Sequence, residues 1–156
     1  EFLARAYRLT DYKQRVDKLF DRFELNDKRK KFGDELSKGM QQKLNICLGL
    51  LPEPKMLLLD EPMIGLDPHA IKQLKSIIEQ MRNEGKTLLV STHIIDSVDM
   101  LWDRTIIMQD AQIRANLTRE ELERDGRTLE QLFFDVTEGI GRDAMSHTED
   151  PASQGG

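Results

Sequence analysis

Two short apolar segments joined by one amphipathic helix constrain the fold of this sequence more than any other feature. The segments span residues 56–59 and 88–90, and wholly apolar runs of this length fit buried parallel strands better than half-exposed ones. Asp67 stands where a helix N-cap belongs, Pro68 at the first helical position, and Gly85 at the stop. The helix between the segments carries apolar residues three to four positions apart, namely Ile71, Leu74, Ile78 and Met81. Strand, helix and strand in this order predict a βαβ unit and an α/β fold.

Helices are predicted before this unit. One follows an apolar stripe formed by Tyr12, Val16, Leu19, Phe20 and Phe23. A charged break over residues 26–33 separates it from a second helix, which Ser37 opens and Pro52 and Pro54 close. The stripe predicted for that second helix comprises Met40, Leu44, Cys47, Leu48 and Leu51.

The segment after residue 90 predicts three further helices and a hairpin. The first helix carries Ile94, Ile95, Val98 and Leu101. Residues 105–109 and 112–117 predict an antiparallel hairpin, with its turn at Asp110 and Ala111 and one face exposed to water. Two capping boxes, Thr118 with Glu121 and Thr128 with Gln131, predict the start of the last two helices, the second of which buries Leu129, Leu132, Phe133 and Val136. Beyond Gly139 polar residues dominate, and we expect a disordered tail.

Length, charge and cysteine content narrow the class of protein. A chain of 156 residues predicts one compact body with one core. The formal charge of −5, with both signs interspersed, argues against a nucleic-acid binder. The apolar runs are shorter than the roughly 20 residues of a membrane span, so we expect any membrane role to come through a partner. The single Cys47 excludes an internal disulfide and predicts a reducing, cytoplasmic setting, and the start at Glu1 rather than Met indicates a fragment.

The first apolar segment ends in two carboxylates, Asp60 and Glu61. Ligands of open α/β sheets collect at the C-terminal ends of the strands. Mg²⁺ takes one or two carboxylate oxygens and keeps several waters, which suits Asp60. Glu61 projects differently and could orient or deprotonate an attacking water. The alternative is a buried strand that ends in an acidic turn.

Four motifs in a fixed order carry a more specific signal. They are Leu36-Ser37-Lys38-Gly39-Met40-Gln41-Gln42, Met56-Leu57-Leu58-Leu59-Asp60-Glu61, Pro62-Met63-Ile64-Gly65-Leu66-Asp67-Pro68 and Ser91-Thr92-His93. This order resembles the second half of ATP-binding cassette (ABC) domains: signature motif, Walker B with catalytic glutamate, D-loop and switch histidine. The resemblance covers roughly residues 2–139 and implies the C-terminal part of a P-loop NTPase fold, with a helical subdomain, a mainly parallel sheet, and a C-terminal hairpin with helices.

The resemblance implies a role for each motif. Glu61 and His93 would be catalytic, Asp60 would hold Mg²⁺, and the nucleotide would be bound by Ser37, Gly39, Gln41 and Asp67. The serine and glycine would contact the γ-phosphate of an ATP held mainly by the opposite subunit. Each residue also has a purely structural interpretation: Ser37 and Asp67 as helix caps, and His93 as a structural histidine. His69 and His147 are given no role.

Three positions depart from the common form of these motifs. Lys38 replaces the first glycine of the LSGGQ pair and Met40 replaces its glutamine, while Ile64 replaces the small polar residue usual in the D-loop. The LSKGM form resembles bacterial exporters of drugs, peptides and antibiotics more than nutrient importers. The change to Ile64 leaves only a backbone role there.

No P-loop of the form GxxxxGK[ST] occurs in the sequence. Gly85-Lys86-Thr87 matches its end, but Gln80 stands at the first glycine, and a helix precedes the segment instead of following it. We therefore expect the isolated chain to hold ATP poorly, because Asp60 and Glu61 add negative charge near the phosphates. We also expect exposed strand edges and apolar faces that make the chain unstable or self-associating.

The resemblance therefore implies an ATP-binding, Mg²⁺-dependent ATPase subunit of an ABC transporter, acting in export. Residues 1–51 would belong to the helical subdomain, 52–139 to the ATPase core, and 140–156 to the tail. Expected partners are a second, head-to-tail ATP-binding subunit and a transmembrane permease at the inner face of the membrane, with no nucleic acid. Two alternatives stay open: a non-transport ABC ATPase, and a truncated cassette that serves only as a binding or regulatory module.

Overall fold

The computed structural model describes residues 1–98 and 101–138, in two compact units. The first unit spans Glu1–His93 and the second begins at Ile94. The predicted single body with one core is therefore wrong. Each unit buries its own apolar residues, for example Leu74 in the first and Leu132 in the second, so one core does not organise the whole chain. The predicted tail over residues 140–156 lies outside the described residues.

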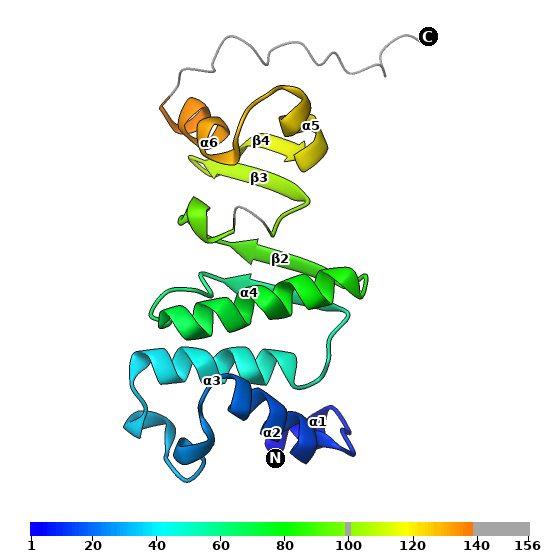
Figure 1. Ribbon diagram of the computed structural model, residues 1–156, viewed down its shortest axis with the longest axis vertical. Helices are drawn as coiled ribbons and strands as arrows, with labels where there is room; N and C mark the ends of the chain where they lie inside the picture. The colour runs from blue at the N-terminus through cyan, green and yellow to red at the C-terminus, as the bar shows by residue number, and fades with distance from the viewer. Residues whose placement is uncertain (99–100, 139–156) are drawn as a thin grey trace. The chain divides into compact units, whose positions relative to one another are not determined.

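The first unit contains four helices and a two-stranded parallel sheet (Figure 1). The predicted charged break holds two 3₁₀ turns, Asn26–Lys28 and Gly33–Glu35. The regular elements of this unit are α1 (Phe2–Ala6), α2 (Tyr12–Arg22), α3 (Lys38–Leu50), β1 (Met56–Asp60), α4 (Pro68–Asn83) and β2 (Thr87–Ser91).

The predicted βαβ unit is confirmed. Strand β1 pairs in parallel with β2, and α4 connects them. The Asp67 side chain accepts a hydrogen bond from the Ala70 backbone N–H at 2.9 Å, with Pro68 at the first turn of the helix. Gly85 follows the helix with φ +72°, the left-handed conformation that glycine adopts without strain. Local residues thus fix both ends of α4.

The strands are less buried than predicted. Leu57 is buried, but Leu58 is 64% exposed and its partner Leu89 is 53% exposed. A strand is buried on both faces only where both faces of its sheet are covered. The helices of the first unit pack against one face of this sheet, and within that unit the face that carries Leu58 and Leu89 stays exposed.

Helix α3 begins as predicted, and Cys47 and Leu51 of the predicted stripe are buried, but the rest of the buried stripe is shifted around the helix. The Ser37 hydroxyl accepts a hydrogen bond from the Met40 backbone N–H at 3.3 Å. Leu48, predicted to be buried, is 40% exposed. The buried residues recur three and four positions apart: Lys43, Ile46, Cys47 and Leu50. Apolar residues surround much of this helix, and its packing against α2 selected this stripe.

The predicted reduced cysteine forms part of this core. Cys47 is a free, buried thiol, and burial raises its pKa to about 12. A thiol this far from ionisation is a poor nucleophile and a poor metal ligand. Cys47 therefore acts as an apolar core residue.

The second unit contains the predicted hairpin and two helices. Both Asp110 and Ala111 at the turn have positive φ. Both predicted capping boxes are present, and the core consists of Ile107, Ala115, Leu122, Leu129 and Leu132. The elements are β3 (Arg104–Gln109), β4 (Gln112–Thr118), α5 (Arg119–Arg124) and α6 (Leu129–Thr137).

The helix predicted to carry Ile94 and Leu101 is wrong within the described residues. A single 3₁₀ turn, Ile95–Ser97, stands there instead, and residues 99 and 100 lie outside the description. Ile94 precedes the turn and has no side chain that can cap a helix. Among all described residues, no helix has both the length and the apolar character needed to cross a bilayer.

Candidate functional site

The C-terminal edge of the parallel sheet brings together the residues that follow its two strands. Asp60 lies opposite Ser91 in the strand register, and the Ser91 hydroxyl donates a hydrogen bond to the Asp60 carboxylate. The backbone N–H of Glu61 donates to the Ser91 carbonyl at 3.0 Å. These contacts place both predicted acids at one edge of the sheet, where open α/β folds bind ligands.

The Glu61 carboxylate is held by three donors from the segment after β2. Its Oε1 lies 3.0 Å from the backbone nitrogen of His93 and 2.6 Å from the His93 Nδ1. Its Oε2 accepts a hydrogen bond from the Thr92 hydroxyl at 3.1 Å. Chiefly the His93 side chain, and then the Thr92 hydroxyl, hold the pKa of Glu61 below its usual value. The carboxylate is therefore fixed in place and kept ionised.

The backbone at Glu61 is in an unusual conformation. Its φ of +43° lies in the left-handed region, which bulky residues rarely adopt. Such strain costs on the order of 1–3 kcal/mol and persists only where surrounding contacts enforce it. Here the sharp change of direction after β1 turns the Glu61 side chain toward Thr92 and His93.

The start of α3 packs directly against the loop that follows Glu61. A Cβ atom added at Gly39 would lie 2.6 Å from the carbonyl oxygen of Gly65, so a side chain at this position would collide with the backbone. Gln41 turns back instead, and its amide donates to the carbonyls of Gly33 at 2.8 Å and Leu36 at 3.2 Å. Gly39 and Gln41, predicted to bind nucleotide, thus also make contacts that stabilise the fold of this chain.

Asp67 ends the same loop and makes two contacts. One carboxylate oxygen caps α4, and the other lies 2.5 Å from the Nζ of Lys43. The Lys43 side chain hydrogen bond, followed by the Ala70 backbone bond, lowers the pKa of Asp67. Sequence reasoning missed Lys43. The signal was its place on the apolar stripe of α3, where a lysine needs a negatively charged partner.

The side chains at the sheet edge and at the start of α3 fit the Mg²⁺ ion and the phosphates that the motifs imply. Asp60 is exposed and offers a carboxylate for Mg²⁺, which requires only one or two such ligands. No cluster of three or more His, Cys, Asp or Glu side chains occurs in the described part of the chain. At the start of α3, a serine hydroxyl and free amides suit an anion.

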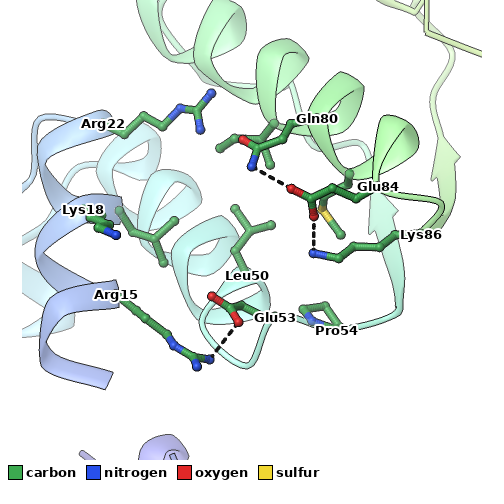
Figure 2. A pocket seen from close by; sticks show the side chains of 12 residues that line it. Arg15, Lys18, Arg22, Leu50, Glu53, Pro54, Gln80, Glu84 and Lys86 are labelled. Atoms are coloured by element: carbon green, nitrogen blue, oxygen red, sulfur yellow. Dashed lines mark hydrogen bonds and ion pairs between the residues drawn. The ribbon is translucent and has the colours of Figure 1, made fainter. Parts of the chain in front are cut away.

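A separate pocket of about 470 Å³ lies between α2, α3 and α4 (Figure 2). Two ion pairs lie among its lining residues: Arg15 lies 3.3 Å from Glu53, and Lys86 lies 2.7 Å from Glu84. None of the predicted site residues lines this pocket. The candidate site is therefore the sheet edge with the adjoining loop, and the pocket is a different surface.

Comparisons with known proteins identify a matching family model and several similar proteins. A family model described as "AAA domain, putative AbiEii toxin, Type IV TA system" matches residues 2–99, more than half of the chain. The chain is 33% identical to the ABC-type transporter ATP-binding protein EcsA of Bacillus subtilis (strain 168), over 88% of this chain and 58% of that protein. It is 41% identical to the lantibiotic transport ATP-binding protein SrtF of Streptococcus pyogenes, over 64% of this chain and 42% of that protein.

A solved structure described as the ATP-binding subunit of an ABC transporter superposes with a TM-score of 0.81. It is 32% identical to this chain, and the match covers 87% of this chain and 59% of that structure. The chain thus spans about half the length of the relatives that it matches.

Proposed function

Because this chain belongs to the ATP-binding cassette (ABC) family of ATPase domains, we propose that its complete form binds and hydrolyses ATP to power export across a membrane. The observation that carries the proposal is the Glu61 carboxylate, fixed between Thr92 and His93 beside Asp60. Relatives named as transport ATP-binding proteins support the transport role, and the LSKGM form of the signature supports export.

Glu61 acts on the water that attacks the γ-phosphate. Its lowered pKa keeps the carboxylate ionised, as an acceptor for a water proton requires, while a low pKa weakens its pull on that proton. Glu61 therefore serves mainly to orient the water, and it accepts the proton at a carboxylate oxygen as the new bond forms. His93 now engages Glu61, and its ring, 69% exposed, is free on its other side to contact the γ-phosphate.

The remaining residues bind the nucleotide and its metal. Asp60 holds Mg²⁺, and when bound this ion neutralises charge on the phosphates. Ser37, Gly39 and Gln41 lie at the start of α3 and Asp67 at the start of α4. They serve an ATP carried by a second ATP-binding subunit arranged head-to-tail. A permease subunit anchors the pair at the cytoplasmic face of the membrane, without nucleic acid. The 156-residue chain alone is inactive, because its sequence has no P-loop.

Replacement of Glu61 tests the proposal directly. In the complete subunit, Glu61→Gln keeps the shape of the side chain but removes its charge, so it cannot accept the proton. We expect kcat for ATP hydrolysis to fall about 100-fold or more, while ATP binding, measured by calorimetry, remains. Glu79→Gln, on the exposed side of α4, is the matched control and keeps full activity. Unchanged hydrolysis in Glu61→Gln would contradict the proposed function.

A further inference from the structure

Lys43 is the one charged residue that is buried in the described part of the chain. Its exposed fraction is 8%, and it lies on α3 among Ile46, Cys47 and Leu50. A buried ammonium is costly unless an opposite charge compensates it. That charge is the Asp67 carboxylate, 2.5 Å from the Lys43 Nζ and 24 positions later in the sequence.

Asp67 is held on its other side as well. Its second carboxylate oxygen accepts the Ala70 backbone N–H at 2.9 Å and so caps α4. The ion pair therefore joins α3 to the exact point where the loop after Glu61 ends and α4 begins. A movement of that loop end relative to α3 would break either the cap or the pair.

Two further contacts join α3 to the same loop. The Gln42 side chain donates to the carbonyl of Pro62 at 3.2 Å. Gly39 lies so close to the carbonyl of Gly65 that no side chain fits there. The helix thus holds the loop near its beginning, at its middle and at its end, and Glu61 directly precedes the first of these points.

We propose that Lys43 is a positioning residue, which through Asp67 holds the Ser37 helix start and the Glu61 loop as one body. This inference rests on the function proposed above, in which Ser37 and Glu61 serve ATP molecules at opposite sites of a subunit pair. The Lys43–Asp67 ion pair, called the latch below, then transmits a displacement at one ATP site to the other. The Ser37 and Glu61 motifs are separated in sequence, and the latch fixes their positions relative to each other.

A purely stabilising role is the competing interpretation. Buried ion pairs contribute little net stability, because the desolvation of both charges offsets most of their attraction. An apolar residue of similar size at position 43 would therefore cost little stability. The two interpretations differ in whether such a residue also changes the turnover of ATP.

The test compares variants of the complete subunit. Lys43→Met keeps most of the length of the side chain and removes its charge. We expect kcat to fall about tenfold and the KM for ATP to stay within about twofold, because the lost interaction serves the reacting state and not ground-state binding. Lys43→Arg restores most of kcat, since a guanidinium also pairs with Asp67. Lys72→Met, on the exposed side of α4, is the matched control and leaves both constants unchanged.

Hydrogen exchange gives a readout that is independent of activity. We expect the backbone amides of residues 61–67 to exchange faster in Lys43→Met, and unchanged in Lys72→Met. Should Lys43→Met fail to fold, the double variant Lys43→Met/Asp67→Asn replaces it, because it removes both charges of the pair while asparagine still caps α4.

The outcomes separate the two proposals. If the unmodified subunit hydrolyses ATP in a Glu61-dependent way and Lys43→Met keeps its kcat, the latch is overturned and the proposed function stands. If the unmodified subunit does not hydrolyse ATP, the proposed function is contradicted, and exchange then decides the latch. Faster exchange at residues 61–67 supports it, and unchanged exchange overturns it.

Discussion

At the residue scale, the contact between Glu61 and His93 fixes the position and the ionised state of the carboxylate at the candidate site. The sequence places these residues at the ends of two neighbouring strands, and the 2.6 Å contact from His93 Nδ1 to the carboxylate depends on the fold. The left-handed backbone at Glu61 is also a product of the fold, because neither its residue type nor its neighbours favour it.

Removal of the imidazole should raise the pKa of Glu61. In His93→Ala the largest cause of its low pKa is lost, while the Thr92 hydroxyl still donates. The shift is measured by a ¹³C carboxyl titration of the chain. His69→Ala, whose ring faces Glu24 at 4.0 Å, is the control and leaves the value unchanged. An unshifted Glu61 in His93→Ala would show that the imidazole does not stabilise the carboxylate.

The same pKa shift links the contact to stability. The pKa of Glu61 is lower in the folded than in the unfolded chain. The stabilisation is therefore complete above the unfolded value, about 4.3. It is lost as the pH falls through the folded value. The free energy of unfolding should therefore fall less between neutral and acid pH in His93→Ala than in the unmodified chain.

At the element scale, local residues explain most of the observed boundaries. The ends of α3 and α4 and both capping boxes follow from Ser37, Asp67, Thr118 and Thr128, each of which accepts a backbone N–H within its own first turn. The segment after His93, where the predicted helix is wrong, has no such cap, because the Ile94 side chain cannot accept a backbone N–H. Where a local cap exists, the sequence predicts an element well.

The turn between β3 and β4 carries strain that a substitution can remove. Ala111 has a φ of +58°, and Asp110 a φ of +52°, the pattern of a type I′ hairpin turn that favours glycine. We expect Ala111→Gly to raise the free energy of unfolding by about 1 kcal/mol, because the left-handed conformation strains alanine. Urea unfolding of the chain measures this change.

The control for that prediction lies in the same hairpin. Ala115 is buried in β4, where glycine weakens a strand, so Ala115→Gly should lower stability by about 0.5–1 kcal/mol. If the same Ala→Gly change raises stability at position 111 and lowers it at position 115, the backbone conformation at each position is the cause of the difference. A loss of stability in Ala111→Gly would contradict the strain at this turn.

At the scale of the whole molecule, the exposed face of the parallel sheet stands out. Met56, Leu58 and Leu89 lie on one face of β1 and β2, and each is more than half exposed. Adjoining apolar side chains of this kind favour association. This arrangement matches the expectation that the isolated chain is unstable or self-associating, which stays a prediction.

Leu58→Lys should reduce self-association of the isolated chain. Sedimentation velocity of the unmodified chain is expected to show concentration-dependent oligomers, and the variant is expected to shift them toward monomer, because a charge on this face opposes its burial. Ile113→Lys, at an exposed apolar position in the hairpin, serves as the control with little effect. A sharp monomer for the unmodified chain at all concentrations would refute the prediction.

The sequence by itself determined the βαβ unit, the capped helix starts, the hairpin and the strand ends next to Asp60, Glu61 and His93. These features depend on residues within a few positions of one another, so local chemistry specifies them. The tertiary structure alone decided which stripe of α3 is buried, which face of the sheet stays open, and that Lys43 pairs with Asp67. Those outcomes depend on contacts between residues distant in sequence, and a charged residue on an apolar stripe reveals its partner only when the chain brings the two together.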